Sequence, residues 1–419
     1  MKSSLLSKTV IFALSLSAPV WALTLQEAVD VGLKSDASVE AFKFTEKATL
    51  QSISKAQAGY LPRVDAVYNA AYERQRDPDT NLKSSYGSIG ASYNLFDGFA
   101  TKYAVAGADA AYQSSQYLTQ ALQADTKLLI EQAYVGVLRA NQQLKVRKEA
   151  LELLEKNFKD THSFYKQGLV AKNSLLETQV ALSLAKQELI KAQSALTLSK
   201  ELLGRRLGRT LLQDEVLEEV PTRMTLETSL ENFKGKALSR RSEIKSYEAQ
   251  ALRVGYQLKG VDATRYPTVA LSVSHTLYGD DFSAGSHKSS YDNATKAEIT
   301  LTYNLYDGGV SQSDRLAYMY TQKAVQANLE SLKQDIALQV EQAYEAFKVA
   351  LENVHVAKDR LAFAKENFYI VDQRYKVQIE TTSTLLDARL NLTQSQVGYV
   401  NATYDVFETY AKLQRTLEE

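Results

Sequence analysis

The stretch Tyr93-Asn94-Leu95-Phe96-Asp97-Gly98 returns almost unchanged as Tyr303-Asn304-Leu305-Tyr306-Asp307-Gly308, 210 positions later in the chain. The same offset relates further segments, which are Ile130-Glu131-Gln132-Ala133-Tyr134 with Val340-Glu341-Gln342-Ala343-Tyr344, and Ser174-Leu175-Leu176-Glu177 with Thr384-Leu385-Leu386-Asp387. Chance matches would not hold one offset over so long a stretch. The chain therefore contains two copies of one structural unit.

The two copies are predicted to span residues 23–203 and 225–419, joined by a linker over residues 204–224. Upstream, the register between the copies slips: Gly59-Tyr60-Leu61-Pro62 matches Thr264-Arg265-Tyr266-Pro267 at a spacing of 205. The difference in spacing is expected to lie in the loop that follows each of these segments.

Each copy contains a long helix with a coiled-coil seam. Apolar residues recur every seven positions, as Ile130, Val137, Leu144, Leu151, Phe158 and Tyr165, and again as Val340, Phe347, Val354, Leu361, Phe368 and Tyr375. No proline, which would break a helix, occurs in residues 79–220 or 268–419. The pattern predicts helices from about Thr101 to Lys166 and from about Ser311 to Lys376, each roughly 100 Å long.

Shorter helical segments flank the long ones. They are predicted over about residues 24–56, 174–203, 225–260 and 383–416. The simplest packing sets them antiparallel to the long helices, with the chain turning at residues 167–173 and 377–382. Each copy then ends in a helical hairpin.

A pair of strands precedes each long helix, over about residues 62–96 and 267–306. Apolar and polar residues alternate there: Val64, Ala66 and Tyr68, for example, share one face of the first strand. The length and rhythm are typical of outer-membrane strands with an apolar outer and a polar inner face, although a half-buried soluble sheet is the alternative. Polar stretches at residues 75–85 and 279–295 are predicted to be the connecting loops.

Four strands cannot form a closed barrel on their own, and open strand edges are not tolerated in lipid. Copies of the chain must therefore pool their strands. Two copies would give eight strands, whose interior side chains fill the barrel, whereas three copies would give twelve and leave a lumen. A conduit favours the trimer.

The first 22 residues are predicted to be a secretory signal peptide cut after Ala22. They have a basic start at Lys2 and Lys8, an apolar stretch from Val10 to Val20 and small residues before the cut; a buried N-terminal helix is the alternative. Cysteine is absent, so export without a lipidated cysteine is expected. No later stretch is apolar over the roughly 18 residues of a membrane-spanning helix.

Composition excludes several functions. The chain of 419 residues has 49 basic and 49 acidic residues, a balance that argues against a general nucleic-acid-binding surface. None of its four histidines, His162, His275, His287 and His355, has the spacing of a metal site. No catalytic triad, phosphate loop or nucleotide fingerprint occurs, so neither an enzyme nor a metal or cofactor site is expected.

The chain resembles the TolC family of outer-membrane efflux and secretion channels along essentially its whole mature length. The resemblance rests on the duplicated order of elements, on the Tyr-Asn-Leu-Phe/Tyr-Asp-Gly strand ends and on Gly168-Leu169-Val170-Ala171 at a helix turn. The resemblance implies an α+β membrane protein: a homotrimer with a 12-stranded transmembrane β-barrel, continued by a periplasmic α-helical barrel. It also implies docking to a periplasmic adaptor and an inner-membrane transporter.

The resemblance further implies two sites. Gly168, Leu169, Val170 and Ala171 would form the adaptor-docking tip, and Tyr375, Glu380, Thr384 and Asp387 would lie where the tunnel narrows. Three positions depart from the family, since Gln378 replaces a usual glycine, Glu380 a basic residue and Thr384 an aspartate. A glycine that merely ends a helix, and an Asp387 that faces a neighbouring helix, are the alternatives.

The predicted function is the exit duct of a tripartite efflux pump or of a type I secretion system, in the outer membrane and extending into the periplasm. A soluble periplasmic coiled-coil scaffold is the alternative. A passive porin is disfavoured because porins join their strands by short periplasmic turns. The cargo and the inner-membrane partner cannot be read from the sequence.

Overall fold

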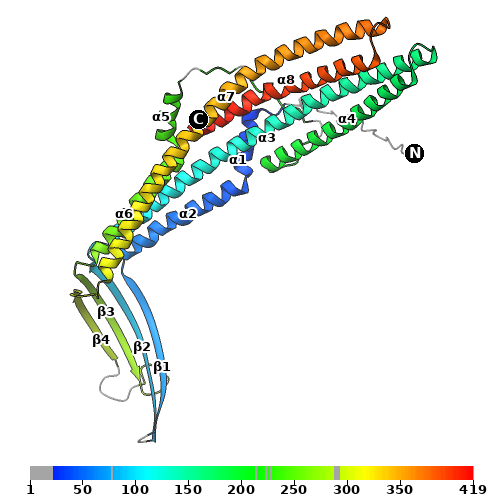
Figure 1. Ribbon diagram of the computed structural model, residues 1–419. Helices are drawn as coiled ribbons and strands as arrows, with labels where there is room; N and C mark the ends of the chain where they lie inside the picture. The colour runs from blue at the N-terminus through cyan, green and yellow to red at the C-terminus, as the bar shows by residue number, and fades with distance from the viewer. Residues whose placement is uncertain are drawn as a thin grey trace, which may run out of the picture. The chain divides into compact units, whose positions relative to one another are not determined.

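The computed structural model describes residues 22–76, 79–212, 215–221, 224–226, 229–286 and 293–418. The chain forms two compact units, each built from separate segments. We call Met1–Ser35, Leu129–Met224 and Leu351–Glu408 the tip unit, and Asp36–Leu128, Thr225–Ala350 and Thr409–Glu419 the sheet unit. Figure 1 labels the helices and strands of both units. The predicted signal peptide lies almost entirely outside the described residues.

The sheet unit contains one antiparallel sheet in the order β1-β2-β3-β4. Its strands are β1 (Arg63–Arg76), β2 (Asp79–Phe96), β3 (Thr268–Gly279) and β4 (Asn293–Thr302). Val64 pairs with Ala91, Ala91 with Val273, and Val273 with Ala297, so the apolar faces of all four strands coincide. This register follows from the period of two, because a slip by one residue would turn an apolar face to the polar side.

Both faces of the sheet are exposed to a large extent, and β1 and β4 are its open edges. On the apolar face Val64, Ile89 and Ile299 are each more than half exposed. The opposite face is rich in small and hydroxyl-bearing residues, such as Ser88, Ser274 and Thr276. The sheet thus has one face suited to lipid and one suited to water.

Two strand boundaries differ from the sequence prediction. Residues 75–85 are predicted to be a loop, but most of them belong to paired strands, because β1 and β2 stay hydrogen-bonded as far as Arg76 and Asp79. Backbone hydrogen bonds form regardless of side-chain polarity, so polar composition was a poor guide there. In the second pair, β4 ends at Thr302 instead of near residue 306, since the Asn304 carboxamide accepts a hydrogen bond from the Tyr306 N–H and turns the backbone.

The helices of the sheet unit include α2 (Ala37–Gln57), a 3₁₀ turn at Ala58–Tyr60, α5 (Leu230–Arg240) and α6 (Ser242–Ala263). Single helices were predicted over residues 24–56 and 225–260, and both are interrupted. Asp36 breaks the first, because its carboxylate accepts hydrogen bonds from the N–H groups of Ser38 and Val39 and so caps α2. The second is interrupted at Arg241.

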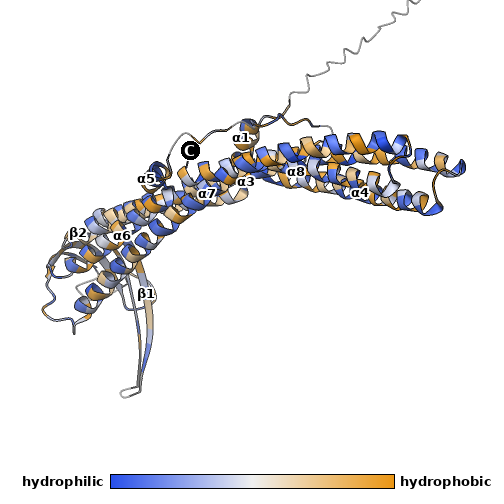
Figure 2. Ribbon diagram, turned by 45° about the horizontal axis from the view of Figure 1, so that its top comes forward, coloured by the Kyte–Doolittle hydropathy of each residue, from blue (hydrophilic) through white to orange (hydrophobic). Residues whose placement is uncertain are grey.

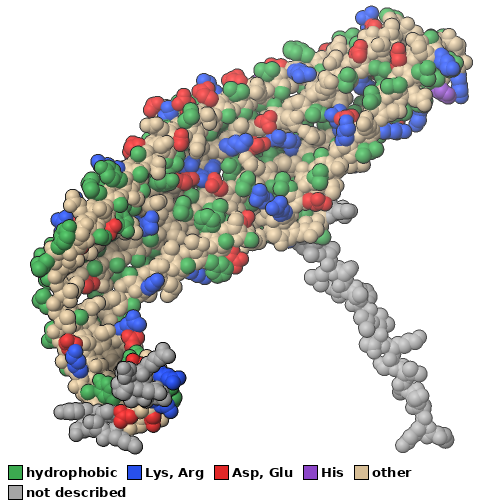
Figure 3. All heavy atoms as spheres, turned by 60° about the horizontal axis from the view of Figure 1, so that its bottom comes forward, with side chains coloured by type: hydrophobic (Ala, Val, Ile, Leu, Met, Phe, Trp, Pro, Cys, Tyr) green, Lys and Arg blue, Asp and Glu red, His purple; other side chains and the backbone are tan. Residues whose placement is uncertain are grey.

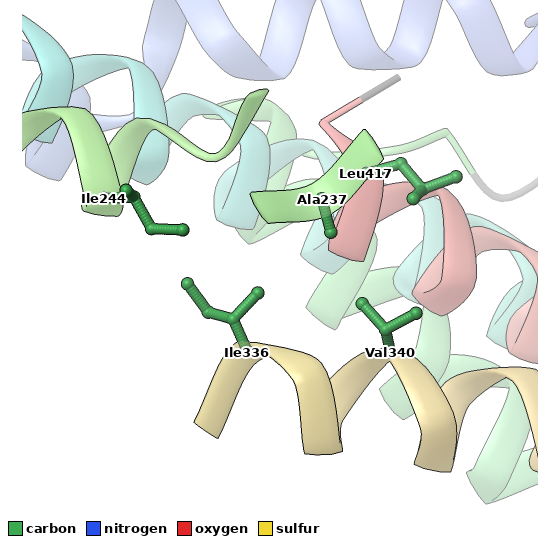
Figure 4. Close-up of a cluster of buried hydrophobic side chains, with 5 residues drawn as sticks. All are labelled: Ala237, Ile244, Ile336, Val340 and Leu417. Atoms are coloured by element: carbon green, nitrogen blue, oxygen red, sulfur yellow. The ribbon is translucent and has the colours of Figure 1, made fainter. Parts of the chain in front are cut away.

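Segments that are far apart in sequence meet in the core of the sheet unit. Ala237 of α5, Ile244 of α6, Leu417 of α8 (Thr382–Leu417), and Ile336 and Val340 of α7 (Val310–Lys376) form one buried cluster (Figure 4). This cluster packs the last turn of α8 against α5, α6 and α7.

An ion-pair network centred on the buried Arg415 lies in the same unit. The Arg415 guanidinium bonds the carboxylates of Asp125 and Glu243, at 2.6 and 2.7 Å. Burial would raise the pKa of Glu243, but its hydrogen bond to Arg415 and the charges of Arg241 and Arg415 outweigh burial and lower the pKa to about 2. The network joins α3 (Ala100–Lys166), α6 and α8.

The folded-state pKa of Glu243 lies below its ordinary value of 4.5, so its stabilising effect is present above about pH 4.5 and is lost as the pH falls toward 2. We expect Glu243→Gln to lower the free energy of unfolding by roughly 3 kcal/mol at neutral pH. The deficit should shrink between pH 4.5 and pH 2. Calorimetry of detergent-solubilised protein checks this, with Glu248→Gln, at an exposed glutamate of the same helix, as the control. A deficit that does not change with pH would contradict the network.

The tip unit is built from α1 (Leu25–Ser35), α4 (Lys172–Leu207) and parts of α3, α7 and α8. Arg139 of α3 bonds Asp405 and Glu408 of α8 at 2.9 and 3.0 Å. Near the turns, the hydroxyls of Thr161 and Tyr375 lie 2.8 Å apart and join α3 to α7. In Figure 1 the tip unit's helices follow the order α7, α8, α3, α4, which places α7 and α4 at its two edges.

The start of the described chain is tied to the linker. The N–H of Leu23 donates to the Val216 carbonyl at 2.9 Å, and the Leu23 carbonyl accepts from the Glu218 N–H at 3.0 Å. The hydroxyl of Tyr134, which is fully buried, lies 2.7 Å from the same carbonyl. Figure 2 shows polar and apolar residues mixed along every helix. Within the described residues, no helix has the length and apolarity needed to cross a membrane.

Candidate functional site

The two helical hairpins of the tip unit turn in the same way. Gly168 and Gln378 both have positive φ, at 71° and 61°. In the first turn the N–H of Leu169 donates to the Phe164 carbonyl, and in the second the N–H of Ile379 donates to the Arg374 carbonyl, both at 2.9 Å. Each turn is thus a left-handed helix cap, and the two are related by the offset of 210.

The second turn holds a strained residue. A side chain in the left-handed region costs roughly 1–2 kcal/mol, and glycine avoids this cost at a smaller penalty in chain entropy. We therefore expect Gln378→Gly to raise the free energy of unfolding of the tip unit by about 0.5–1 kcal/mol. Gly168→Gln should lower it by a similar amount. Thermal unfolding of the two reciprocal variants measures both shifts, and equal signs would contradict the cap geometry.

The four docking candidates form the exposed turn between α3 and α4. Leu169 is 55% exposed, and a side chain added at Gly168 would meet open space. Val170 is partly buried, and Ala171 is the residue before α4. The turn therefore offers a small residue beside an exposed apolar one, which is what a partner needs for close approach and burial.

The four constriction candidates lie in different surroundings. Tyr375 is in the core: it packs with Val371, Leu385 and Ala388, and its ring meets Phe164 edge-on. The seven-residue repeat also predicted that Tyr375 packs in the coiled-coil seam of the long helix. Its hydroxyl ties the two hairpins together through Thr161.

Glu380 and Thr384 belong to the second turn. The Glu380 carboxylate lies 3.6 Å from the Arg374 guanidinium, so it faces the end of α7. The N–H of Thr384 donates to the Thr381 hydroxyl at 3.2 Å, which caps the start of α8. Both residues have local bonds that hold the turn.

Asp387 differs from the other three because it is exposed. Its carboxylate makes no hydrogen bond or ion pair to any described residue. Leu385 beside it is buried and Leu386 is partly buried, so α8 turns its apolar side to the core and Asp387 away from it. This placement leaves Asp387 available to line an aqueous path.

Sequence reasoning missed two buried polar residues of the tip unit. Arg389 of α8 and Asn157 of α3 are almost fully buried, and the Arg389 Nε and Nη1 and the Asn157 Nδ2 bond no described acceptor. Spacing could have revealed Arg389, which follows the buried Leu385 by four positions and so lies on the same face of α8.

Two helices of the tip unit carry exposed apolar stripes. On α7 the stripe repeats every seven residues, as Val356, Phe363 and Ile370, and Phe363 is 75% exposed; Val377 continues the spacing just past the helix end. On α4 the stripe comprises Leu176, Val180, Leu184, Ile190, Leu198 and Leu202. On the face drawn in Figure 3, hydrophobic side chains lie among charged ones along the helices. The two stripes are on the helices that Figure 1 draws at the edges of the tip unit.

The histidines have ordinary surroundings where they are described. His162 stacks on Phe158, and the His275 Nδ1 lies 2.8 Å from the Thr295 hydroxyl. His287 lies outside the described residues. Among the residues that the structure places, no group of three or more His, Cys, Asp or Glu side chains could hold a metal ion.

Residues 29–209 and 235–418 match a protein family described as outer membrane efflux protein. The chain belongs to this family. It is 20% identical over 407 residues to outer membrane efflux protein BepC of Brucella suis, with 94% of this chain and 85% of BepC covered. Among solved structures it resembles the CmeC outer membrane channel of Campylobacter jejuni, with a TM-score of 0.81, 14% identity and coverage of 94% and 85% of the two chains. It also resembles the outer membrane protein VceC of Vibrio cholerae, with a TM-score of 0.78, 16% identity and coverage of 94% and 95%.

Membership of the outer membrane efflux protein family confirms the predicted TolC-type fold and the predicted function as an outer-membrane efflux channel. The comparisons give the soluble-scaffold alternative no support. The family and the structural relatives are channels, and none is an enzyme.

Proposed function

We propose that the chain is the exit duct of a tripartite export system, in which three copies form one channel across the outer membrane. Each copy contributes its four strands to one barrel. The copies dock through their periplasmic turns to an adaptor and an inner-membrane transporter. The chain reaches the periplasm with a signal peptide that is removed after Ala22, and it carries no lipid on cysteine.

The observation that carries this proposal is the exposed apolar surface on α4 and α7, the helices at the two edges of the tip unit (Figure 1). The stripes on α4 and α7 leave large side chains in water, and such surface on a soluble monomer is unusual. The unpaired edges of β1 and β4 have the same need for a partner. In a ring of copies, each copy would place its α4 against the α7 of the next copy and its β1 against the β4 of the next copy. This arrangement would cover both apolar stripes and both open sheet edges.

Crosslinking in cells tests the partner. Replacing Leu169 with a photo-reactive residue should yield an adduct with a periplasmic adaptor. Leu212, which is exposed at the linker, serves as the matched control position. Adducts at Leu212 but none at Leu169 would contradict the docking turn. The transporter that copurifies with the adduct then distinguishes a small-molecule pump from a type I secretion system.

Asp387 supplies a further prediction, because threefold symmetry would place three copies of its carboxylate around one axis. Acidic rings attract cations, and close carboxylates resist full ionisation together. We expect Asp387→Asn to shift the reversal potential in a salt gradient toward zero and to weaken block by multivalent cations from the periplasmic side. With Thr384 in place of a second acidic residue, the parent should show only moderate cation preference. Identical reversal potentials in planar bilayers would mean that Asp387 does not line the constriction.

A further inference from the structure

The exposed stripes of α4 and α7 have matching spacing. Three exposed apolar residues of each helix decide the match: Leu176, Leu184 and Ile190 on α4, and Ile370, Phe363 and Val356 on α7. The two helices run in opposite directions, since α7 ends at its turn and α4 begins at its own. When Leu184 is placed opposite Phe363 in an antiparallel pair, each of the other two α4 residues comes within one residue of its α7 counterpart.

The helical turns give the same alignment independently. The hydroxyls of Thr161 and Tyr375 lie 2.8 Å apart, so the two turns of one copy lie at about one level. Rotation about a ring axis parallel to the helices keeps that level in the next copy. The alignment places Lys172, the first residue of α4, opposite Tyr375, which is one residue before the end of α7.

The surface of α4 is hollowed where this alignment needs space. A groove lies on its exposed face, and its walls are side chains three and four residues apart: Leu176, Gln179, Val180, Ser183, Leu184 and Gln187. The alignment sets Phe363 and Ile370 over this groove. Large apolar side chains that enter such a hole on a facing helix are the packing unit of coiled coils.

The charges within the stripes also match. Lys191 follows Leu184 by seven residues, so the alignment places it opposite Val356. Glu352 and Asp359 lie four residues before and three residues after Val356, and therefore on the same face of α7. Both are exposed, and no hydrogen bond or ion pair joins either carboxylate to a described residue.

Lys191 can turn to these carboxylates at little cost. Its Nζ lies 2.8 Å from Glu188 in the same helix, at an exposed position. Arg147 also bonds Glu188, at 3.3 Å, so the glutamate keeps a cationic partner when Lys191 leaves it.

We propose that α4 of one copy packs antiparallel on α7 of the next with Leu184 opposite Phe363, and that Lys191 lies between Glu352 and Asp359 of the next copy. The inference rests on the proposed ring and fixes its register. A slip by seven residues would keep the stripes in contact but would set the turns roughly 10 Å out of level and would move Lys191 away from Val356.

Paired cysteines test the register, because the chain has no cysteine of its own. A disulfide needs Cα atoms within about 7 Å, and the periplasm is oxidising. Leu184→Cys with Phe363→Cys should run as a covalent trimer on non-reducing gels. Leu176→Cys with Ile370→Cys should do the same while keeping Phe363. The shifted pair, Leu184→Cys with Ile370→Cys, should stay monomeric because its cysteines lie roughly 10 Å apart along the helices.

The gels separate the register from the ring. A covalent trimer from the shifted pair and from neither aligned pair would overturn the register and leave the ring standing. Monomers from all three pairs would overturn the contact between α4 and α7, and the proposed ring with it.

Charge reversal tests the position of Lys191. Lys191→Glu should lower the temperature at which the trimer dissociates, because it places three carboxylates together at each contact. Asp359→Lys in the same chain should restore most of the loss. Lys186→Glu, two residues from Leu184 and so on another face of α4, is the control and should change little. Equal dissociation temperatures for the parent and Lys191→Glu would overturn the pairing of Lys191 with the next copy.

Discussion

Phe363→Glu is expected to leave the chain unable to form its oligomer. Phe363 is the most exposed member of the α7 stripe, and the proposed ring buries it against α4 of the next copy. Loss of a buried aromatic side chain removes about 1.5–3 kcal/mol at each interface. An unpaired carboxylate in an apolar contact adds a further cost of several kcal/mol. Because the defect recurs at every interface of the ring, the assembled form should be lost.

The measurement is size-exclusion chromatography with light scattering in detergent. Gln373→Glu is the matched control, because it adds the same charge at an exposed polar position of α7 that lies off the stripe by helical spacing. We expect the control to assemble as the parent does. Normal assembly of Phe363→Glu would show that the α7 stripe is not the contact between copies.

Gly168→Trp is expected to abolish export while leaving assembly and membrane insertion intact. The added ring points into open space, so it disturbs no packing within the chain. It would nevertheless block close approach of an adaptor to the turn and to Leu169. Export by cells that carry only the variant should fall to the level of cells without the protein.

Gly168→Ala separates bulk from backbone strain at this turn. Any side chain at a φ of 71° is strained, so alanine has the strain without the bulk. Export should survive in the alanine variant. If export is normal with tryptophan, the turn is not a docking site and Gly168 simply ends a helix; if alanine also stops export, strain rather than docking explains the loss.

Much of the fold was predictable because apolar residues recur at regular spacings in the sequence and because the two copies share one offset. The seven-residue spacing and the absence of proline predicted long helices to Lys166 and Lys376, where α3 and α7 end. Alternation predicted both strand pairs and the single apolar face that the register produces. The offset of 210 also relates Gly168 to Gln378, and the two share one turn geometry.

The remaining features depend on single side chains that no period reveals. Asp36 splits a helix through its own capping bonds, and Asn304 ends a strand in the same way. For the candidate site, resemblance indicated Asp387 but not its exposure, and it grouped Tyr375 with the tunnel although its side chain packs in the core. Arg389 was not anticipated, since an arginine in a polar helix resembles any solvated charge until its burial is known.

Native mass spectrometry of the detergent-solubilised protein tests the central claim most directly. In the proposed ring, neighbouring copies cover the open edges of β1 and β4 and the apolar stripes on α4 and α7, and a water-filled lumen requires more than eight strands. The account predicts a stable species of three chains, each beginning at Leu23. A monomer or a dimer as the sole stable species would contradict it.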